Sequence, residues 1–274
     1  MAAAVGAMGT TGIAFAGGAS ISSVAHNDSG ALALARASAA IPSEVLSAHF
    51  RIIPGGHSPA AIGRGASGSF VGFPRRGSTF GLLSSGCASL APARNGSGRT
   101  TCRDGKKIFR GTRDTTVLGI RLAVPSNATC LSVRFRFLSD EYPEFVGSEF
   151  NDAFIAELDR STWHTSSNAP RIRAPRNFAK TVNNRNISVN GAGVGRVSPA
   201  FSRGTTYDAG TRLLRASTPV SPGHHTLWLS IFDQGDNIYD STVLLDGITL
   251  DRLSPCRRGV AADVPTTGSP QFTG

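Results

Sequence analysis

The sequence FRFLSDEYPEFVGSEFNDAFIAELD, residues 135–159, decides which fold this chain can adopt. It opens with alternating residues: Phe135 and Phe137 share one face and Arg136 lies on the other, as in a half-buried strand. An acidic, aromatic-rich loop follows, and the chain then returns to a short apolar run at AFIAEL. Because that run is short and bounded by Asn-Asp and Asp-Arg-Ser, the pattern predicts strand, loop and strand.

Negative charge is concentrated in this loop and in one other stretch. From Asp140 to Asp159 there are seven acidic residues and no Lys or Arg. The stretch FDQGDNIYDSTVLLDGITLD, residues 232–251, has five acidic residues and again no basic one. Together they hold twelve of the chain's 18 carboxylates, although its formal net charge is +10. Such loops require a counter-charge, and a bound cation is the simplest candidate.

Calcium is the cation that these residue types favour. It takes about six to eight oxygen ligands, and both stretches supply carboxylates, amides and turn carbonyls. In a sandwich the loops at one end come together, so the two stretches are expected to meet. The predicted ligands are Asp140, Glu141, Asn151, Asp152, Asp233, Asp236 and Asp240. Asp246 lies inside the last expected strand, where it could instead pair with an Arg.

Two other interpretations of the acidic residues remain open. The first is a network of turns and capping hydrogen bonds without a metal. The second is a glycosidase, in which an acid and a nucleophile or base flank the scissile bond. Glu141, Glu144 and Asp152 are close enough in sequence to be candidates for that chemistry.

Three blocks carry a family resemblance: SDEYPEFVGSEFNDAF, then NISVNGAG, then SIFDQGDNIYDSTVLLDGITL. In this order they resemble the signature blocks of the choice-of-anchor L domain, a bacterial surface-protein module. The similarity extends from about Ser29 to Arg252. It implies an extracellular, β-rich domain found with many different surface-attachment signals, and it implies no established catalytic chemistry.

The rest of the chain predicts an all-β fold. Gly and Pro supply 32 and 15 of 274 residues, which suits many turns between short strands. We expect a two-sheet antiparallel β-sandwich, jelly-roll-like, with one short N-terminal helix that Asp28 or Ser29 could cap. The helix is expected at 28–40 and strands at 45–53, 69–73, 79–83, 115–124, 130–138, 153–158, 187–189, 195–197, 225–232 and 242–250.

The expected organisation is one domain at 26–256 between two terminal segments. Residues 1–25 are rich in Ala and Gly and read as a signal-like leader, with small-x-small cleavage sites ending at Ala16 or Ala25. A disordered leader is the alternative. The apolar part is too short and broken to span a bilayer, and no transmembrane segment is expected. Residues 257–274 lack periodicity and are expected to be a disordered tail.

The four cysteines show no spacing typical of a zinc site, and an even number of widely spaced cysteines suits two disulfides in an oxidising compartment. The preferred pairs among three connectivities are Cys87 with Cys102 and Cys130 with Cys256. The first would close a polar loop, and the second would tie a strand start to the end of the domain. Buried free thiols are the alternative.

The basic residues do not form an obvious binding stripe. Only three of the 28 cations are Lys, and the Arg residues are scattered, so nucleic-acid binding is not expected. Either the surface is simply basic and soluble, or it attracts anionic cell-wall polymers. No Ser-His-Asp arrangement is readable, and each His is expected at the surface or in a turn. Trp163, Tyr142, Phe145 and Tyr239 could stack on sugar rings or pack within the loops.

These observations predict a secreted or cell-surface, non-enzymatic module for adhesion or surface display, stabilised by calcium. The alternatives are a carbohydrate-binding module and a glycoside hydrolase-type enzyme. The expected partner is a cell-surface polymer, glycan or protein, and the expected state is a monomer.

Overall fold

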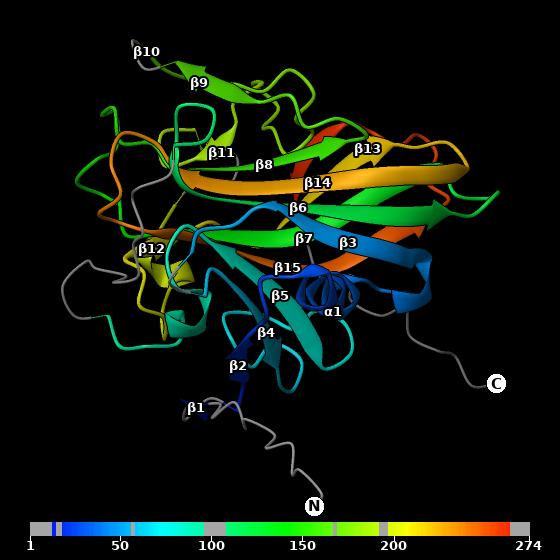
Figure 1. Cartoon of the computed structure of the whole chain (residues 1–274), viewed down its shortest axis with the longest axis horizontal. Coiled ribbons are helices and arrows are strands. Elements are labelled where there is room, and N and C mark those ends of the chain that lie inside the picture. The colour runs from blue at the N-terminus through cyan, green and yellow to red at the C-terminus, as the bar shows by residue number, and fades with distance from the viewer. Residues whose placement is uncertain are drawn as a thin grey trace, which may run out of the picture.

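The computed structural model describes residues 13–14, 18–55, 58–95, 108–166, 169–191 and 197–263. Two antiparallel sheets pack on each other as a sandwich, which confirms the predicted fold class (Figure 1). The larger sheet has the order β1-β2-β4-β5-β15-β7-β13-β16, with β12 also paired to β7. The smaller sheet has the order β11-β8-β14-β6-β3, and β9 pairs with β10 separately. The finer likeness to a jelly roll remains a prediction.

The strands of the larger sheet are β1 (Ile13–Ala14), β2 (Ser20–Ser23), β4 (Ala60–Arg64), β5 (Thr79–Ser84), β7 (Cys130–Ser139), β12 (Ala209–Gly210), β13 (Leu214–Pro219), β15 (Ser241–Asp251) and β16 (Gly259–Ala262). Those of the smaller sheet are β3 (Val45–Ile52), β6 (Arg113–Val124), β8 (Ala153–Leu158), β11 (Ile187–Ser188) and β14 (Gly223–Asp233). The separate hairpin is β9 (His164–Ser166) and β10 (Ala169–Arg173). Short 3-10 turns are η1 (Pro42–Glu44), η2 (Ala88–Leu90) and η3 (Pro199–Phe201).

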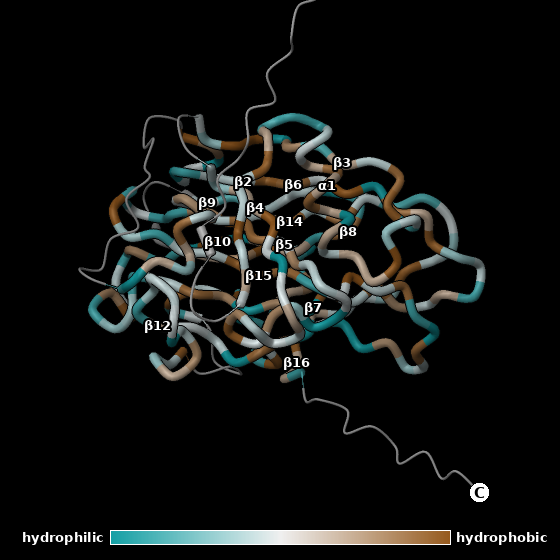
Figure 2. Tube along the Cα trace, turned by 90° about the horizontal axis from the view of Figure 1, so that it is seen from below, coloured by the Kyte–Doolittle hydropathy of each residue, from teal (hydrophilic) through white to brown (hydrophobic). Residues whose placement is uncertain are grey.

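The central strands are buried on both faces. Between the sheets, Phe135 of β7 packs with side chains of β6, β14 and β15 in the main core. On the outer face of the larger sheet, Phe80 and Tyr207 belong to a second apolar cluster. Trp163 and Phe232 belong to a third, outside the smaller sheet. Strands covered on both sides read as continuous apolar runs, such as TVLLDGITL (Figure 2).

The helix α1 (Asp28–Ser38) closes one side of the sandwich, beside β3 and over β5 (Figure 1). The sequence predicted Asp28 or Ser29 as its cap; in the structure Asn27 is the N-cap, and its side chain accepts a hydrogen bond from the Gly30 N–H at 2.9 Å. The helix reaches β5 at Gly81, where a Cβ atom would lie 2.2 Å from Ser38 Oγ. A side chain at position 81 would therefore push the helix away from the sheet.

Several expected boundaries were wrong for local reasons. Residues 69–73 form a tight turn instead of a strand, because Val71 and Gly72 have positive φ while Phe70 and Phe73 exchange backbone hydrogen bonds. The loop expected before that segment contains β4. The expected tail contains β16, which pairs with β13. The expected strand at 195–197 lies mostly outside the described residues.

The segment predicted as a leader, residues 1–25, also contains strands. Strand β2 pairs with β4, and Ile21 is buried in the apolar cluster outside the larger sheet. Cleavage after Ala25 would remove this strand, whereas cleavage after Ala16 would keep it. If the leader is processed, the fold therefore favours the earlier site.

The disulfide predicted between Cys130 and Cys256 is present, with the two Cα atoms 5.5 Å apart. It joins the start of β7 to the segment before β16. Cys87 is also disulfide-bonded. Its predicted partner, Cys102, lies outside the described residues, so that pairing stays a prediction.

Candidate functional site

The two acidic loops, residues 139–152 and 233–241, lie against each other at one end of the sandwich. The first connects β7 to β8 and the second connects β14 to β15, so each crosses between the sheets. Because β7 pairs with β15 and β8 pairs with β14, both crossings occur at the same end. The Asp140 N–H donates to the Asp240 carbonyl oxygen at 3.1 Å, and the Asn151 N–H donates to that of Gln234 at 3.2 Å.

Most of the predicted ligands are buried where these loops meet. Asn151 is 8% exposed, and Asp236 lies at the edge, half-buried. Five carboxylates are at most 1% exposed, and we call them the acidic cluster: Asp140, Glu141, Asp152, Asp233 and Asp240. Burial of so many carboxylates is rare unless the charges are paired, neutralised or bound to a metal.

Some members of the cluster are well supported by hydrogen bonds. Asp152 accepts from the Gln234 N–H at 3.3 Å and from the Ser241 hydroxyl at 2.8 Å. Asp140 accepts from the Asp208 N–H at 3.2 Å. These bonds connect the first acidic loop to the second and to the segment before β12.

Others lack such support. Within the described part of the chain, Glu141 Oε2 and both carboxylate oxygens of Asp233 are buried and accept no hydrogen bond of good geometry. The Ser85 hydroxyl lies close to Asp233 but donates to the Ser241 carbonyl oxygen at 3.3 Å. Asp240 makes further polar contacts, so Glu141 and Asp233 are the acids whose charge most needs a partner.

The mutual repulsion of these groups shows in their pKa values. Burial first, and then the charge of Asp152, raise the pKa of Glu141 to about 9. Burial likewise raises the pKa of Asp152 to about 7, although hydrogen bonds with Asp233 and Ser241 oppose the change. The pKa of Asp233 is raised well above its usual range, first by burial and then by the charge of Asp152.

The backbone of Gly86 packs closely against the acidic cluster. A Cβ atom there would lie 2.2 Å from the Asp240 carboxylate. The adjacent Ser85 accepts the Ser241 N–H through its hydroxyl oxygen at 2.9 Å. The end of β5 therefore holds the second acidic loop in place, and position 86 has no room for a side chain.

The acidic cluster is not a preformed coordination shell. Among the described residues, no group of three or more His, Cys, Asp or Glu side chains stands ready to hold a metal ion. The carboxylates would have to rotate toward a common centre to bind calcium. The metal site therefore stays a prediction.

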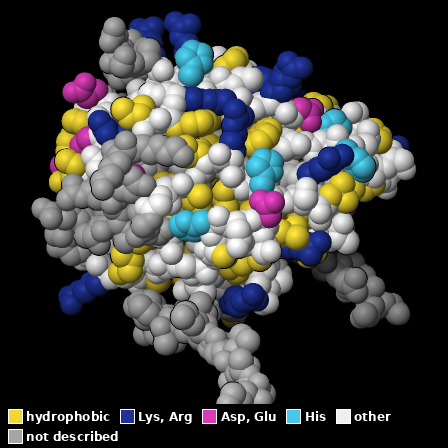
Figure 3. Space-filling model, viewed as in Figure 1, with side chains coloured by type: hydrophobic (Ala, Val, Ile, Leu, Met, Phe, Trp, Pro, Cys, Tyr) yellow, Lys and Arg dark blue, Asp and Glu magenta, His cyan; other side chains and the backbone are white. Residues whose placement is uncertain are grey.

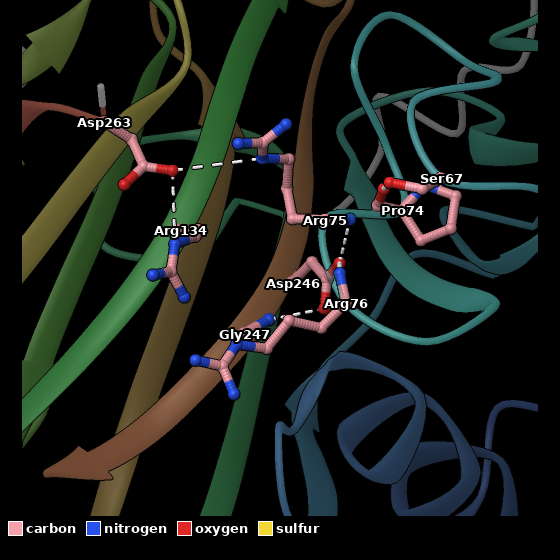
Figure 4. A network of polar contacts seen from close by, with 8 residues as sticks. All are labelled: Ser67, Pro74, Arg75, Arg76, Arg134, Asp246, Gly247 and Asp263. Carbon is pink, nitrogen blue, oxygen red and sulfur yellow. Dashed lines mark hydrogen bonds and ion pairs between the residues drawn. The ribbon is translucent and has the colours of Figure 1, made fainter. Parts of the chain in front are cut away.

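Asp246 lies elsewhere, on β15 beside the turn at 74–76 (Figure 4). Its carboxylate accepts hydrogen bonds from the backbone N–H groups of Arg75, Arg76 and Gly247. Burial raises its pKa, and these three bonds and the charge of Arg134 oppose that change. Asp246 is thus held by donors that the acidic cluster does not share, and it is not placed with the predicted ligands.

The aromatic residues near the site have structural contacts. Trp163 is fully buried, stacks on Phe232 at 4.2 Å between ring centroids, and donates to Ser230 Oγ at 2.9 Å. It therefore packs in the loops and cannot serve as a sugar platform. Phe145 contacts Tyr239 with 5.2 Å between ring centroids, and both rings are partly exposed beside the acidic loops.

One constellation escaped the sequence analysis. The Ser221 hydroxyl lies 3.2 Å from His225 Nε2, and His225 Nδ1 lies 3.0 Å from Asp159 Oδ1. This is the order of contacts in a Ser-His-Asp triad. Only the spacing of Ser221 and His225 was visible in the sequence, because Asp159 comes from the end of β8. The Asp159 side chain is 44% exposed, unlike the buried Asp of a typical triad.

The family model of the choice-of-anchor L domain matches residues 82–251. The chain belongs to the choice-of-anchor L domain family. The matched region of this choice-of-anchor L domain runs from within β5 to the end of β15 and contains both acidic loops. It starts later than the resemblance at Ser29 suggested. No curated protein and no solved structure matches the chain.

Membership of the choice-of-anchor L family points to a module of surface or secreted proteins. In the described part of the chain, no helix is long and apolar enough to cross a membrane.

The raised pKa values predict that the chelator-stripped choice-of-anchor L domain loses stability as pH rises. Folded-state pKa values above the unfolded values mean that protonation favours folding. The resulting stability is complete below the unfolded pKa of about 4 and is lost as pH passes the folded values, about 7 for Asp152 and about 9 for Glu141. Calorimetry without divalent ions should therefore show a melting temperature that falls from about pH 5 to about pH 9.

Asp152→Asn and Glu141→Gln should each flatten this fall, whereas Glu144→Gln, in an exposed position of the same loop, should leave it unchanged. A melting temperature that is constant or rises across this range would show that the cluster does not carry the repulsion argued above.

Proposed function

We propose that this choice-of-anchor L domain is a non-enzymatic adhesion or display module, secreted or attached to the cell surface, whose acidic loops bind a structural calcium ion. The observation that supports the cation is the burial of five carboxylates where two cross-sheet connections meet. Outside the cell, millimolar calcium is available to weak sites in extracellular modules.

Calcium would relieve the repulsion and tie the two connections together. Glu141 and Asp233 are the first candidates, since in the described part of the chain Glu141 Oε2 and both carboxylate oxygens of Asp233 are buried and accept no hydrogen bond of good geometry. The charge of Asp152 raises the pKa of both Glu141 and Asp233. Rotation of these side chains toward one centre would replace repulsion between carboxylates with attraction to the ion, and Asn151 could add an amide oxygen.

The same burial argues against a glycosidase. Its two catalytic carboxyl groups must reach a sugar, and Glu141 and Asp152 are at most 1% exposed. A carbohydrate-binding role keeps some support from the partly exposed rings of Phe145 and Tyr239.

Calcium should raise the melting temperature of the chelator-stripped protein at neutral pH. Stabilisation by a ligand follows its concentration relative to Kd, and a hundredfold excess adds about 2.7 kcal/mol. In a domain of this size, about 2–4 °C is expected for each kcal/mol. Asp233→Asn and Glu141→Gln should abolish the calcium response while raising stability in its absence.

Glu144→Gln is the matched control, since it removes one exposed charge from the first acidic loop and should keep the full response. A calcium-independent melting temperature in the wild type, or an equal response in the two buried variants, would rule out the calcium role. Magnesium at the same concentration tests selectivity.

A serine hydrolase is the second candidate function, favoured only by the contacts among Ser221, His225 and Asp159. Covalent labelling by a fluorophosphonate tests it directly, because labelling requires a nucleophilic hydroxyl activated by its base. If the proposal of a non-enzymatic module is right, labelling of wild type should equal that of Ser221→Ala and of heat-denatured protein. Labelling that is lost in both Ser221→Ala and His225→Ala would instead establish an activated serine.

A further inference from the structure

Two adjoining cavities share no lining residue with the acidic cluster. The first, of about 680 Å³, is bounded by β13, β16, the loop at 175–184 and the segment at 253–258. The second, of about 630 Å³, is bounded by the end of the β9–β10 hairpin and the residues after it. Pro175 and Lys180 line both, so the two cavities adjoin, and we treat them together as one groove.

The charged residues that line this groove are all basic. None of its lining residues is Asp or Glu, and His164 adds a titratable ring. The cations are Arg171, Arg173, Lys180, Arg215, Arg257 and Arg258, and we call this surface the basic groove. Figure 3 shows Lys and Arg side chains gathered along the molecular edge over the β9–β10 hairpin.

The cations of the basic groove form no ion pair among the described residues, although the Arg258 guanidinium donates to the Arg176 carbonyl oxygen. Burial lowers the pKa of Lys180, and so does the charge of Arg258, while Glu157 opposes the change. The Glu157 carboxylate is itself engaged, because it accepts the Thr162 N–H at 2.8 Å and the Thr162 hydroxyl at 2.6 Å.

The walls of the groove are tied to the sandwich. The Val260 N–H of β16 donates to the Lys180 carbonyl oxygen at 2.8 Å. The Asn177 side chain accepts from the Ala156 N–H of β8 at 3.0 Å and from the Ala179 N–H at 2.9 Å. The disulfide to Cys256 fixes the segment before β16. The cations are therefore presented by backbone that is already in place, which lowers the entropic cost of binding.

We propose that the basic groove binds a linear acidic polysaccharide. Its length over two cavities suits a chain of several sugar units, and the separated cations suit anionic groups repeated along a polymer. Between them, the exposed Asn184 offers an amide for sugar hydroxyls. Phe178 is the one Phe, Tyr or Trp side chain in the lining and is 1% exposed, so only the imidazole of His164 is open for stacking on a nucleic-acid base.

The inference deepens the proposed adhesion role and rests on it for its biological setting, but the binding itself does not depend on calcium. It also revises the expectation from sequence that the Arg residues are scattered. The cations of the groove come from three separate stretches of chain, and only the fold brings them together.

The test is binding of the full chain to polygalacturonate in about 150 mM salt, with neutral dextran and duplex DNA as parallel probes. The groove variant is Lys180→Gln/Arg215→Gln/Arg257→Gln. The matched control is Arg64→Gln/Arg76→Gln/Arg203→Gln, three exposed cations that do not line the groove. We expect polygalacturonate binding that weakens about tenfold or more in the groove variant and less than about threefold in the control, with no binding of dextran.

The salt dependence of polygalacturonate binding should also fall, by a slope of about one for each contacting cation removed. Equal losses in the two variants would assign binding to the diffuse basic surface and overturn the proposal. Tighter binding of duplex DNA than of polygalacturonate would overturn it in favour of nucleic acid. Calcium-dependent melting is measured on the same protein preparations. A protein that responds to calcium but fails the polygalacturonate test contradicts the groove proposal alone, whereas one without a calcium response contradicts the proposed calcium role.

Discussion

The adjacency of two strand pairs, β7 with β15 and β8 with β14, is the constraint on which the rest of this structure depends. Each of the two connections between these strands must pass from one sheet to the other, and antiparallel pairing places both passages at one end. The acidic loops are therefore pressed together by the same pairing that builds the core. The ends of the two loops therefore cannot separate without loss of the central strand pairs.

Two groups of buried carboxylates in this domain differ in their surroundings. Asp246 and Asp263 meet backbone N–H groups or guanidinium groups, and Arg134 lies 3.1 Å from Asp263 (Figure 4). In the acidic cluster, the strongest charge acting on Glu141 is instead that of Asp152. Because the pKa of Glu141 is raised to about 9, a proton can neutralise this carboxyl group even at neutral pH, and a bound divalent ion would have to displace that proton.

Alternation and apolar runs made the central strands predictable. The strand expected at 153–158 agrees with β8 at both ends, because Asn-Asp and Asp-Arg-Ser mark its limits. The meeting of the acidic loops also followed from the sandwich. Edge strands such as β16 were missed. The local sequence of β16 has no strand pattern, and it is a strand because it pairs with β13. The basic groove and the contact of Asp159 with His225 join distant segments, which spacing along the chain cannot reveal.

The most direct test of the shared cation is an anomalous-diffraction map of the calcium-soaked crystal at neutral pH. The account predicts a calcium peak between the two acidic loops, with oxygens of Glu141, Asp152 and Asp233 at about 2.3–2.6 Å from it. An ordered cluster without a peak, its carboxyl oxygens in short contacts that share protons, would contradict the account.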